Sequence, residues 1–108
     1  MSRNVPGTLF DDVLEADGTA DSQPYSPRQR TSIVSFRVEA EGAGTLEAFT
    51  PSPLPGENPI SLATATTLSA GGAIVTLTDV VVPELFVRLT DTSSSVNRIV
   101  VEVWDNGE

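Results

Sequence analysis

The stretch ELFVRLTDTSSSVNRIVVEVW, residues 84–104, determines the predicted fold class. Aliphatic residues occupy every second position through residues 85–89 and again through residues 99–103, on either side of the polar segment TDTSSSVN at residues 90–97. Because successive side chains of a strand point to opposite faces, each run predicts a strand with one face directed toward a core. The two apolar rows are Leu85, Val87 and Leu89 in the first run and Ile99, Val101 and Val103 in the second.

The same stretch predicts an antiparallel hairpin with a definite outer face. Several registers of this hairpin let both apolar rows face one core. One of them places Arg88 opposite Glu102 and Phe86 opposite Trp104. Registers shifted by two residues from this one let both rows face the core as well. Cross-strand charge and aromatic pairs of this kind each contribute up to about 1 kcal/mol.

The outer face of this predicted hairpin is too apolar for free solvent and too polar for a core. Phe86, Val100 and Trp104 make it apolar, while Arg88 and Glu102 bring charge. Such a mixture suits a covered or partner-facing surface. Three interpretations stay open: cover by another segment of the same chain, a subunit interface, and a ligand site such as a sugar-stacking platform.

The rest of the chain after residue 31 repeats the strand pattern. SIVSFRVEAE (32–41) alternates, GAG (42–44) predicts a tight turn, and TLEAFT (45–50) is expected to return antiparallel. PSPLPGENP (51–59) has four prolines in nine residues, which predicts a stiff loop. Together with AIVTLTDVVV (73–82), these segments predict an all-β fold, an antiparallel β-sandwich or small jelly roll of six to seven strands.

The N-terminal residues 1–31 have a different composition. They hold five of the fifteen acids and three of the eight prolines. TLFDDVL (8–14) is expected to be a short strand or a docking segment, followed by a loop. The sequence therefore predicts an N-terminal arm and loop over residues 1–31 and a β-sandwich domain over residues 32–108. The arm and the 51–59 loop are the two candidates for covering the outer face within the chain.

A predicted interface combines the arm with the outer face of the last hairpin. Arg28 and Arg30, which precede the first core strand, are interpreted either as balance for an acidic surface or as partners for an acidic patch on another subunit. The predicted interface residues are Leu9, Phe10, Arg28, Arg30, Phe86, Arg88, Val100, Glu102 and Trp104.

The composition argues against catalysis. The chain has no Cys and no His, so it lacks thiol nucleophiles, the commonest general base and the commonest transition-metal ligands. DDVLEADGTAD (11–21) resembles a calcium loop only in composition, because an EF-hand aligned from Val13 lacks its first ligand and has Pro24 at its twelfth position. We expect a protein without enzymatic activity, cofactor or metal site.

Charge is the strongest compositional signal. Fifteen acids face six basic residues, all of them arginine, for a net charge of −9. GC-rich coding and life in molar salt, where charge repulsion is screened, both account for this composition. The chain has no basic patch for nucleic acid, and no apolar run approaches the roughly 18 residues of a membrane span. We therefore expect no nucleic-acid partner and no membrane insertion.

From Tyr25 to Trp104, the order of features resembles small virion proteins of tailed viruses. The matching pieces are YSPRQRTSIVSFRVEAE (25–41), GAGTLEAF (42–49), SAGGAIVTL (69–77) and LFVRLT (85–90). The chain departs from that pattern in its long proline-rich loop, where a short turn is usual.

The resemblance implies a non-enzymatic structural protein of the virion, assembled in the host cytoplasm. It implies an oligomeric capsid decoration or vertex turret, with a tail or baseplate subunit or a module that binds host-surface glycan or protein as the alternative. The partners would be further copies of the chain and the major capsid or other virion proteins. With the lysine-free acidic composition, the resemblance suggests a halophilic archaeal host.

Overall fold

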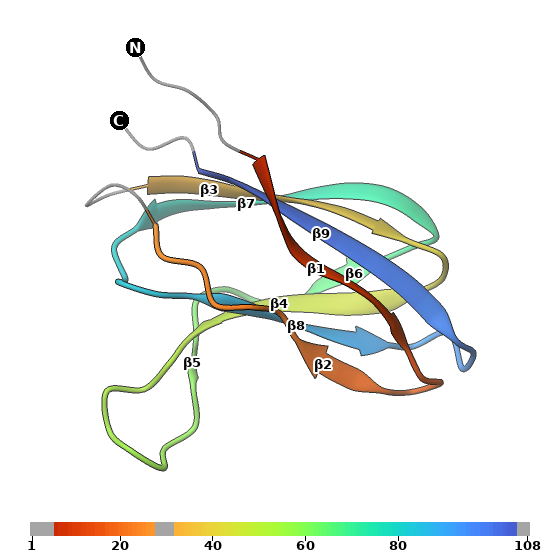
Figure 1. Ribbon diagram of the computed structural model, residues 1–108, viewed down its shortest axis with the longest axis horizontal. Helices are drawn as coiled ribbons and strands as arrows, with labels where there is room; N and C mark the ends of the chain where they lie inside the picture. Colours follow the sequence, from red (N-terminus) through yellow and green to blue (C-terminus); the bar gives the residue numbers. More distant parts are fainter. Residues whose placement is uncertain (1–5, 28–31, 106–108) are drawn as a thin grey trace.

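All regular structure in the described part of the chain is β-structure, arranged in two antiparallel sheets that face each other (Figure 1). The computed structural model describes residues 6–27 and 32–105. In these residues no helix is long and apolar enough to cross a membrane. The strands are β1 (Pro6–Leu14), β2 (Thr19–Asp21), β3 (Ser32–Ala40), β4 (Gly44–Thr50), β5 (Ile60–Ser61), β6 (Thr66–Leu68), β7 (Gly71–Val80), β8 (Phe86–Asp91) and β9 (Asn97–Asp105).

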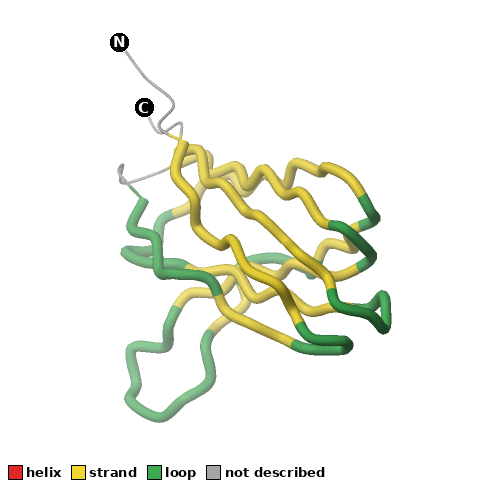
Figure 2. The backbone as a smooth tube through the Cα atoms, turned by 45° about the vertical axis from the view of Figure 1, so that its right-hand side comes forward, coloured by secondary structure: helices red, strands yellow, loops and turns green. Residues whose placement is uncertain are grey.

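The two sheets form a sandwich, which confirms the predicted fold class. Sheet A has the order β1-β9-β3-β7, and sheet B has the order β2-β8-β4-β5, with β6 also paired to β4. Figure 2 shows the two sets of strands as separate layers joined by loops at their ends. The described residues form nine strands rather than six or seven, because β1 and β2 come from the segment that was predicted as an arm and because β5 and β6 are very short.

The predicted hairpin of residues 84–104 is wrong, because its two strands lie in different sheets. β8 pairs with β2 and β4, whereas β9 pairs with β1 and β3. Arg88 therefore lies opposite Asp21 and Glu47 rather than opposite Glu102. Alternation fixes which side chains point inward, but it does not fix which strand lies beside which. Both apolar rows do face the core, but they reach it from opposite sheets.

The expected pairing of residues 32–41 with residues 45–50 fails for the same reason. β3 belongs to sheet A and β4 to sheet B, so the glycines between them lead the chain across the sandwich. Gly44 is required there by close packing, since a Cβ at this position would lie 2.6 Å from the carbonyl oxygen of Thr90. A larger residue would push β4 away from β8.

The core is the space between the inward rows of both sheets. Each of the long strands contributes alternate apolar residues to it, and several of these are fully buried. The largest apolar side chains with less than 2 % exposure are Phe36, Leu46, Leu68, Leu85, Leu89, Ile99, Val34, Val38, Val87 and Val101. Burial of one such side chain contributes about 1.5–3 kcal/mol.

The N-terminal segment supplies an edge strand to each sheet. β1 pairs with β9 and β2 pairs with β8. A bulge between Thr8 and Phe10 lets two consecutive side chains, Leu9 and Phe10, turn into the core. The strand expected within residues 8–14 is confirmed, and it lies beside β9 rather than over its outer face. The 51–59 loop projects from the sandwich beyond β5 (Figures 1 and 2).

We predict that the N-terminal segment is needed for stability. Phe10→Ala should lower the free energy of unfolding by about 3 kcal/mol, because the phenyl ring is 8 % exposed and its loss leaves a cavity. Val13→Ala in the same strand, at a side chain that is 50 % exposed, should change it by less than about 0.5 kcal/mol. Urea unfolding followed by circular dichroism measures both. Equal midpoints for Phe10→Ala and wild type would show that β1 is dispensable.

Candidate functional site

The residues predicted to form one interface are distributed over different parts of the molecule. Phe86 and Arg88 lie on the outer face of sheet B, whereas the outward residues of β9 lie on the outer face of sheet A. Leu9 and Phe10 are buried between the sheets, and Arg28 and Arg30 fall outside the described residues. The β9 residues concerned are Val100, Glu102 and Trp104, all half-buried.

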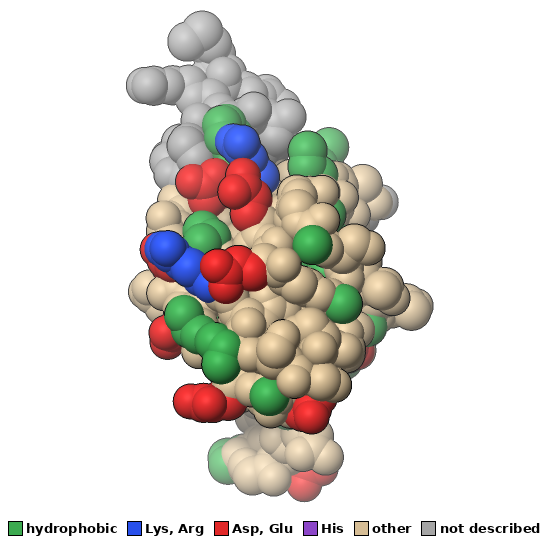
Figure 3. Space-filling model, turned by 90° about the vertical axis from the view of Figure 1, so that its right-hand side faces the viewer, with side chains coloured by type: hydrophobic (Ala, Val, Ile, Leu, Met, Phe, Trp, Pro, Cys, Tyr) green, Lys and Arg blue, Asp and Glu red, His purple; other side chains and the backbone are tan. Residues whose placement is uncertain are grey.

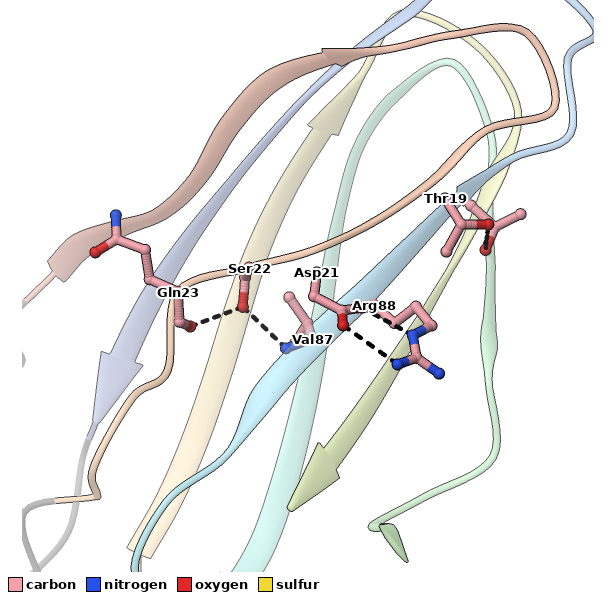
Figure 4. Close-up of polar contacts among 7 residues, drawn as sticks. Thr19, Asp21, Ser22, Gln23, Val87 and Arg88 are labelled. Atoms are coloured by element: carbon pink, nitrogen blue, oxygen red, sulfur yellow. Dashed lines mark hydrogen bonds and ion pairs between the residues drawn. The ribbon is translucent and has the colours of Figure 1, made fainter. Parts of the chain in front are cut away.

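The outer face of sheet B carries a compact group around Arg88, which we name the Arg88 cluster (Asp21, Glu47, Phe49, Phe86 and Arg88). The guanidinium donates from Nε and Nη2 to the Asp21 carboxylate at 2.8 and 3.2 Å (Figure 4). Its central carbon lies 4.8 Å from the ring centroid of Phe49 and 5.9 Å from that of Phe86. The two rings stack with centroids 5.6 Å apart.

Strand register brings the Arg88 cluster together from three strands. Phe49 of β4 lies directly opposite Phe86 of β8, and Arg88 has Glu47 on one side and Asp21 on the other. The hydrogen bond to Asp21, followed by the neighbouring negative charges, raises the pKa of Arg88. Glu47 in turn accepts a hydrogen bond of 2.8 Å from the hydroxyl of Ser61 in β5. The cluster therefore links four strands of sheet B.

The short strand β2 is held to β8 by side chains as well as by the backbone. The Ser22 hydroxyl accepts a hydrogen bond from the amide of Val87 at 3.0 Å and donates to the Gln23 carbonyl at 2.9 Å (Figure 4). The Ser22 amide donates to the Val87 carbonyl at 2.8 Å. These contacts explain how an edge of three residues stays in place.

The Arg88 cluster offers little free aromatic surface. A sugar ring stacks on an open aromatic face, but Phe49 and Phe86 use faces on each other and on the guanidinium. Arg88 and Asp21 keep 37 and 45 % of their side-chain surface exposed, so they remain accessible to a polar partner. The arrangement is suited to fastening strands and to polar contact with another surface.

The outer face of sheet A carries exposed ion pairs. Arg37 lies 4.0 Å from Glu102 and 3.9 Å from Glu39, and Arg98 lies 3.0 Å from Asp11. The space-filling view in Figure 3 shows acidic side chains beside arginines, with hydrophobic side chains between them. Ion pairs this exposed contribute little to stability, typically below about 1 kcal/mol each. This face is a mixed, hydrated surface.

A buried polar network at one end of the sandwich was not anticipated. Asp91, 2 % exposed, accepts hydrogen bonds from the Ser93 hydroxyl, the Asp17 amide, the Ser93 amide and the Asn97 side chain. The Ser93 hydroxyl first and the Asp17 amide second hold the pKa of Asp91 well below its usual range. Four donors to one carboxylate fix the loops around it.

Asn97 extends the network to the crossing between the sheets. Its amide nitrogen donates to the Ala43 carbonyl at 3.0 Å, and its amide oxygen accepts from the Gly42 amide at 2.9 Å. The network thereby joins the β1–β2, β3–β4 and β8–β9 connections. A signal for it was present in the sequence, because Asp91 and Asn97 continue the inward rows of Leu89 and Ile99.

Comparisons with known proteins show the fold and no family. No protein-family model matches the sequence, and no curated protein matches it significantly. The PBSX exported protein XepA has a similar structure, with a TM-score of 0.73 and 16 % identity over 96 % of this chain. This chain spans 37 % of the length of XepA.

Two carbohydrate-binding modules share the sandwich less closely. CBM36, solved with calcium and xylotriose, has a TM-score of 0.53 and 12 % identity, with 97 % of this chain and 93 % of the module covered. The D114A mutant of CBM29-2 has a TM-score of 0.52 and 14 % identity, with coverage of 98 and 81 %. At these identities, the likeness establishes a common fold.

We predict that the Asp91 network makes the free energy of unfolding depend on pH in the acidic range. Because the folded pKa of Asp91 is depressed, its contribution is present above the unfolded value of about 4 and is lost as the pH falls below it. Asp91→Asn should lower the melting temperature at neutral pH and flatten its decline below about pH 4. Thermal scans across this range measure both effects.

The control for this prediction is Glu57→Gln, which removes one negative charge from the exposed 51–59 loop. It should leave the melting temperature and its pH dependence close to those of wild type. If Asp91→Asn and Glu57→Gln behave alike, net charge and not the network governs the acid limb.

Proposed function

We propose that this protein is a non-enzymatic structural component of a tailed-virus particle, an oligomeric capsid decoration or vertex turret. The observation that carries this proposal is the likeness to the PBSX exported protein XepA, which extends over 96 % of the chain at a TM-score of 0.73. The carbohydrate-binding modules match the same residues at lower scores. A tail or baseplate position belongs to the same proposal.

The structure offers physical support for a role based on shape and contact. The 51–59 loop is stiffened by prolines, it projects from the sandwich (Figure 1), and its residue Leu54 is 64 % exposed. A stiff loop loses little conformational entropy when it docks on a neighbour. The acids on the remaining surface keep it hydrated, which suits a particle in high salt and thus a halophilic host.

We predict that the chain accompanies assembled particles. Particles from cells that carry its gene are separated on a density gradient, and the chain and a known capsid protein are quantified by mass spectrometry across the fractions. The two proteins should peak together at a constant ratio of many copies per particle. A chain confined to the unassembled fractions at the top of the gradient contradicts the proposal.

Glycan binding is the second candidate, favoured by the fold shared with CBM36 and CBM29-2 and by the half-buried Trp104 on the outer face of sheet A. Calorimetry with xylo- and manno-oligosaccharides tests it. The structural role predicts no saturable heat. Saturable binding that is lost in folded Trp104→Ala and kept in Phe86→Ala would favour the glycan-binding role and place the site on sheet A.

A further inference from the structure

The outer edge of β7 is the feature that the proposed function leaves unexplained. On one side β7 pairs with β3 along almost its whole length. On the other side, no strand of the described residues pairs with it. The strand has ten residues, which gives about 33 Å of edge, and Asp79 is its single charged residue. Unpaired N–H and C=O groups along such an edge are a template for a further strand.

The other sheet edges are protected in ways that β7 is not. The opposite edge of sheet A is β1, which has a bulge after Thr8 and carries Asp11 and Asp12. In sheet B the edges are β2 with three residues and, beyond β4, the short strands β5 and β6. Bulges, charges and short length are the usual protections of an edge against pairing. Among the described edge strands, β7 alone is long, has no bulge near its middle and contains a single charged residue.

The side chains next to this edge are suited to an incoming strand. Ile74 is 74 % exposed, and Val81, just beyond the strand, is 68 % exposed. A cavity of about 320 Å³ at β7 is lined by Leu62, Leu77 and Val80, and also by Thr76 and Thr78. Strand addition uses backbone hydrogen bonds for affinity and apolar pockets for alternate side chains. β7 offers the unpaired backbone edge, together with a cavity of mixed polar and apolar lining.

We propose that β7 pairs antiparallel with β7 of a second copy of this chain, so that the two four-stranded sheets A continue across a two-fold axis. Antiparallel pairing of identical strands is self-complementary, since each residue finds its partner by the same operation. The distribution of negative charge also favours contact through β7. Two chains of net charge −9 repel, and the sequence of β7 contains a single acid, whereas that of β1 contains two.

This pairing places the exposed Ile74 near its counterpart across the axis. Registers centred on residue 74 or 75 keep the inward row facing the core and bring Ile74 opposite, or two residues from, Ile74 of the second copy. The apolar side chain is then covered by the partner strand. The inference stands independently of the proposed function, since it concerns the free chain in solution.

Sedimentation velocity over a wide range of concentration tests the pairing. Wild type should show a monomer–dimer equilibrium, and Ile74→Lys should raise the dissociation constant by about tenfold or more, because two like charges meet at the axis. The matched control is Val13→Lys, which changes an exposed β-branched residue on the other edge of sheet A. It should leave the dissociation constant within about twofold of wild type.

Hydrogen exchange of the wild-type chain locates the contact without any substitution. Residues 71–80 should exchange more slowly in concentrated than in dilute protein, while residues 6–14 should not change. A wild type that stays monomeric at every concentration overturns the pairing. A dimer whose dissociation constant is unchanged by Ile74→Lys also overturns the pairing. Protection that appears on another strand overturns it as well, because the contact would then lie on another face.

Discussion

The remainder of the structure depends on the packing of the inward side chains of β9 between the two sheets. β9 is a central strand of sheet A, with β1 on one side and β3 on the other. Its inward positions, from Asn97 to Asp105, are all buried. The three apolar ones pack against the inward rows of sheet B, whereas the two polar ones lie at the ends of the strand. This order, apolar in the middle and polar at both ends, defines how far the sandwich extends.

The two polar ends anchor the connections. At one end Asn97 and Asp91 satisfy backbone groups of three loops at once. At the other end the buried Asp105 accepts a hydrogen bond of 2.9 Å from the Tyr25 hydroxyl, and Tyr25 pairs with Leu85 through an isolated bridge. A buried carboxylate is costly unless it is hydrogen-bonded. Each end therefore favours one arrangement of the loops and hence one register of the strands.

The sequence allowed the fold class to be predicted, but not the pairing of strands. Alternation identified Leu85, Val87 and Ile99 as inward residues, and all three are buried. It could not distinguish a hairpin from two strands that face each other across a core, because both place the same residues inside. The role of β1 was also hidden, since its bulge breaks the period at Leu9 and Phe10. The candidate site was predicted less accurately than the fold class. The outer residues of β8 and β9 were assigned to one face, but they lie on the outer faces of two different sheets.

The distribution of charge explains how a strongly acidic chain keeps both a stable core and a surface for contact. Several of its acids are engaged: Asp21 with Arg88, Asp11 with Arg98, and Asp91 with four hydrogen-bond donors. The negative charges of these residues lie on the outer faces of the sheets and in the Asp91 network. There, water, arginine or backbone amides compensate them. β7 and the tip of the 51–59 loop carry little charge and expose apolar side chains. Because repulsion between two such chains is weakest where their acids are fewest, the charge pattern itself favours these surfaces for contact.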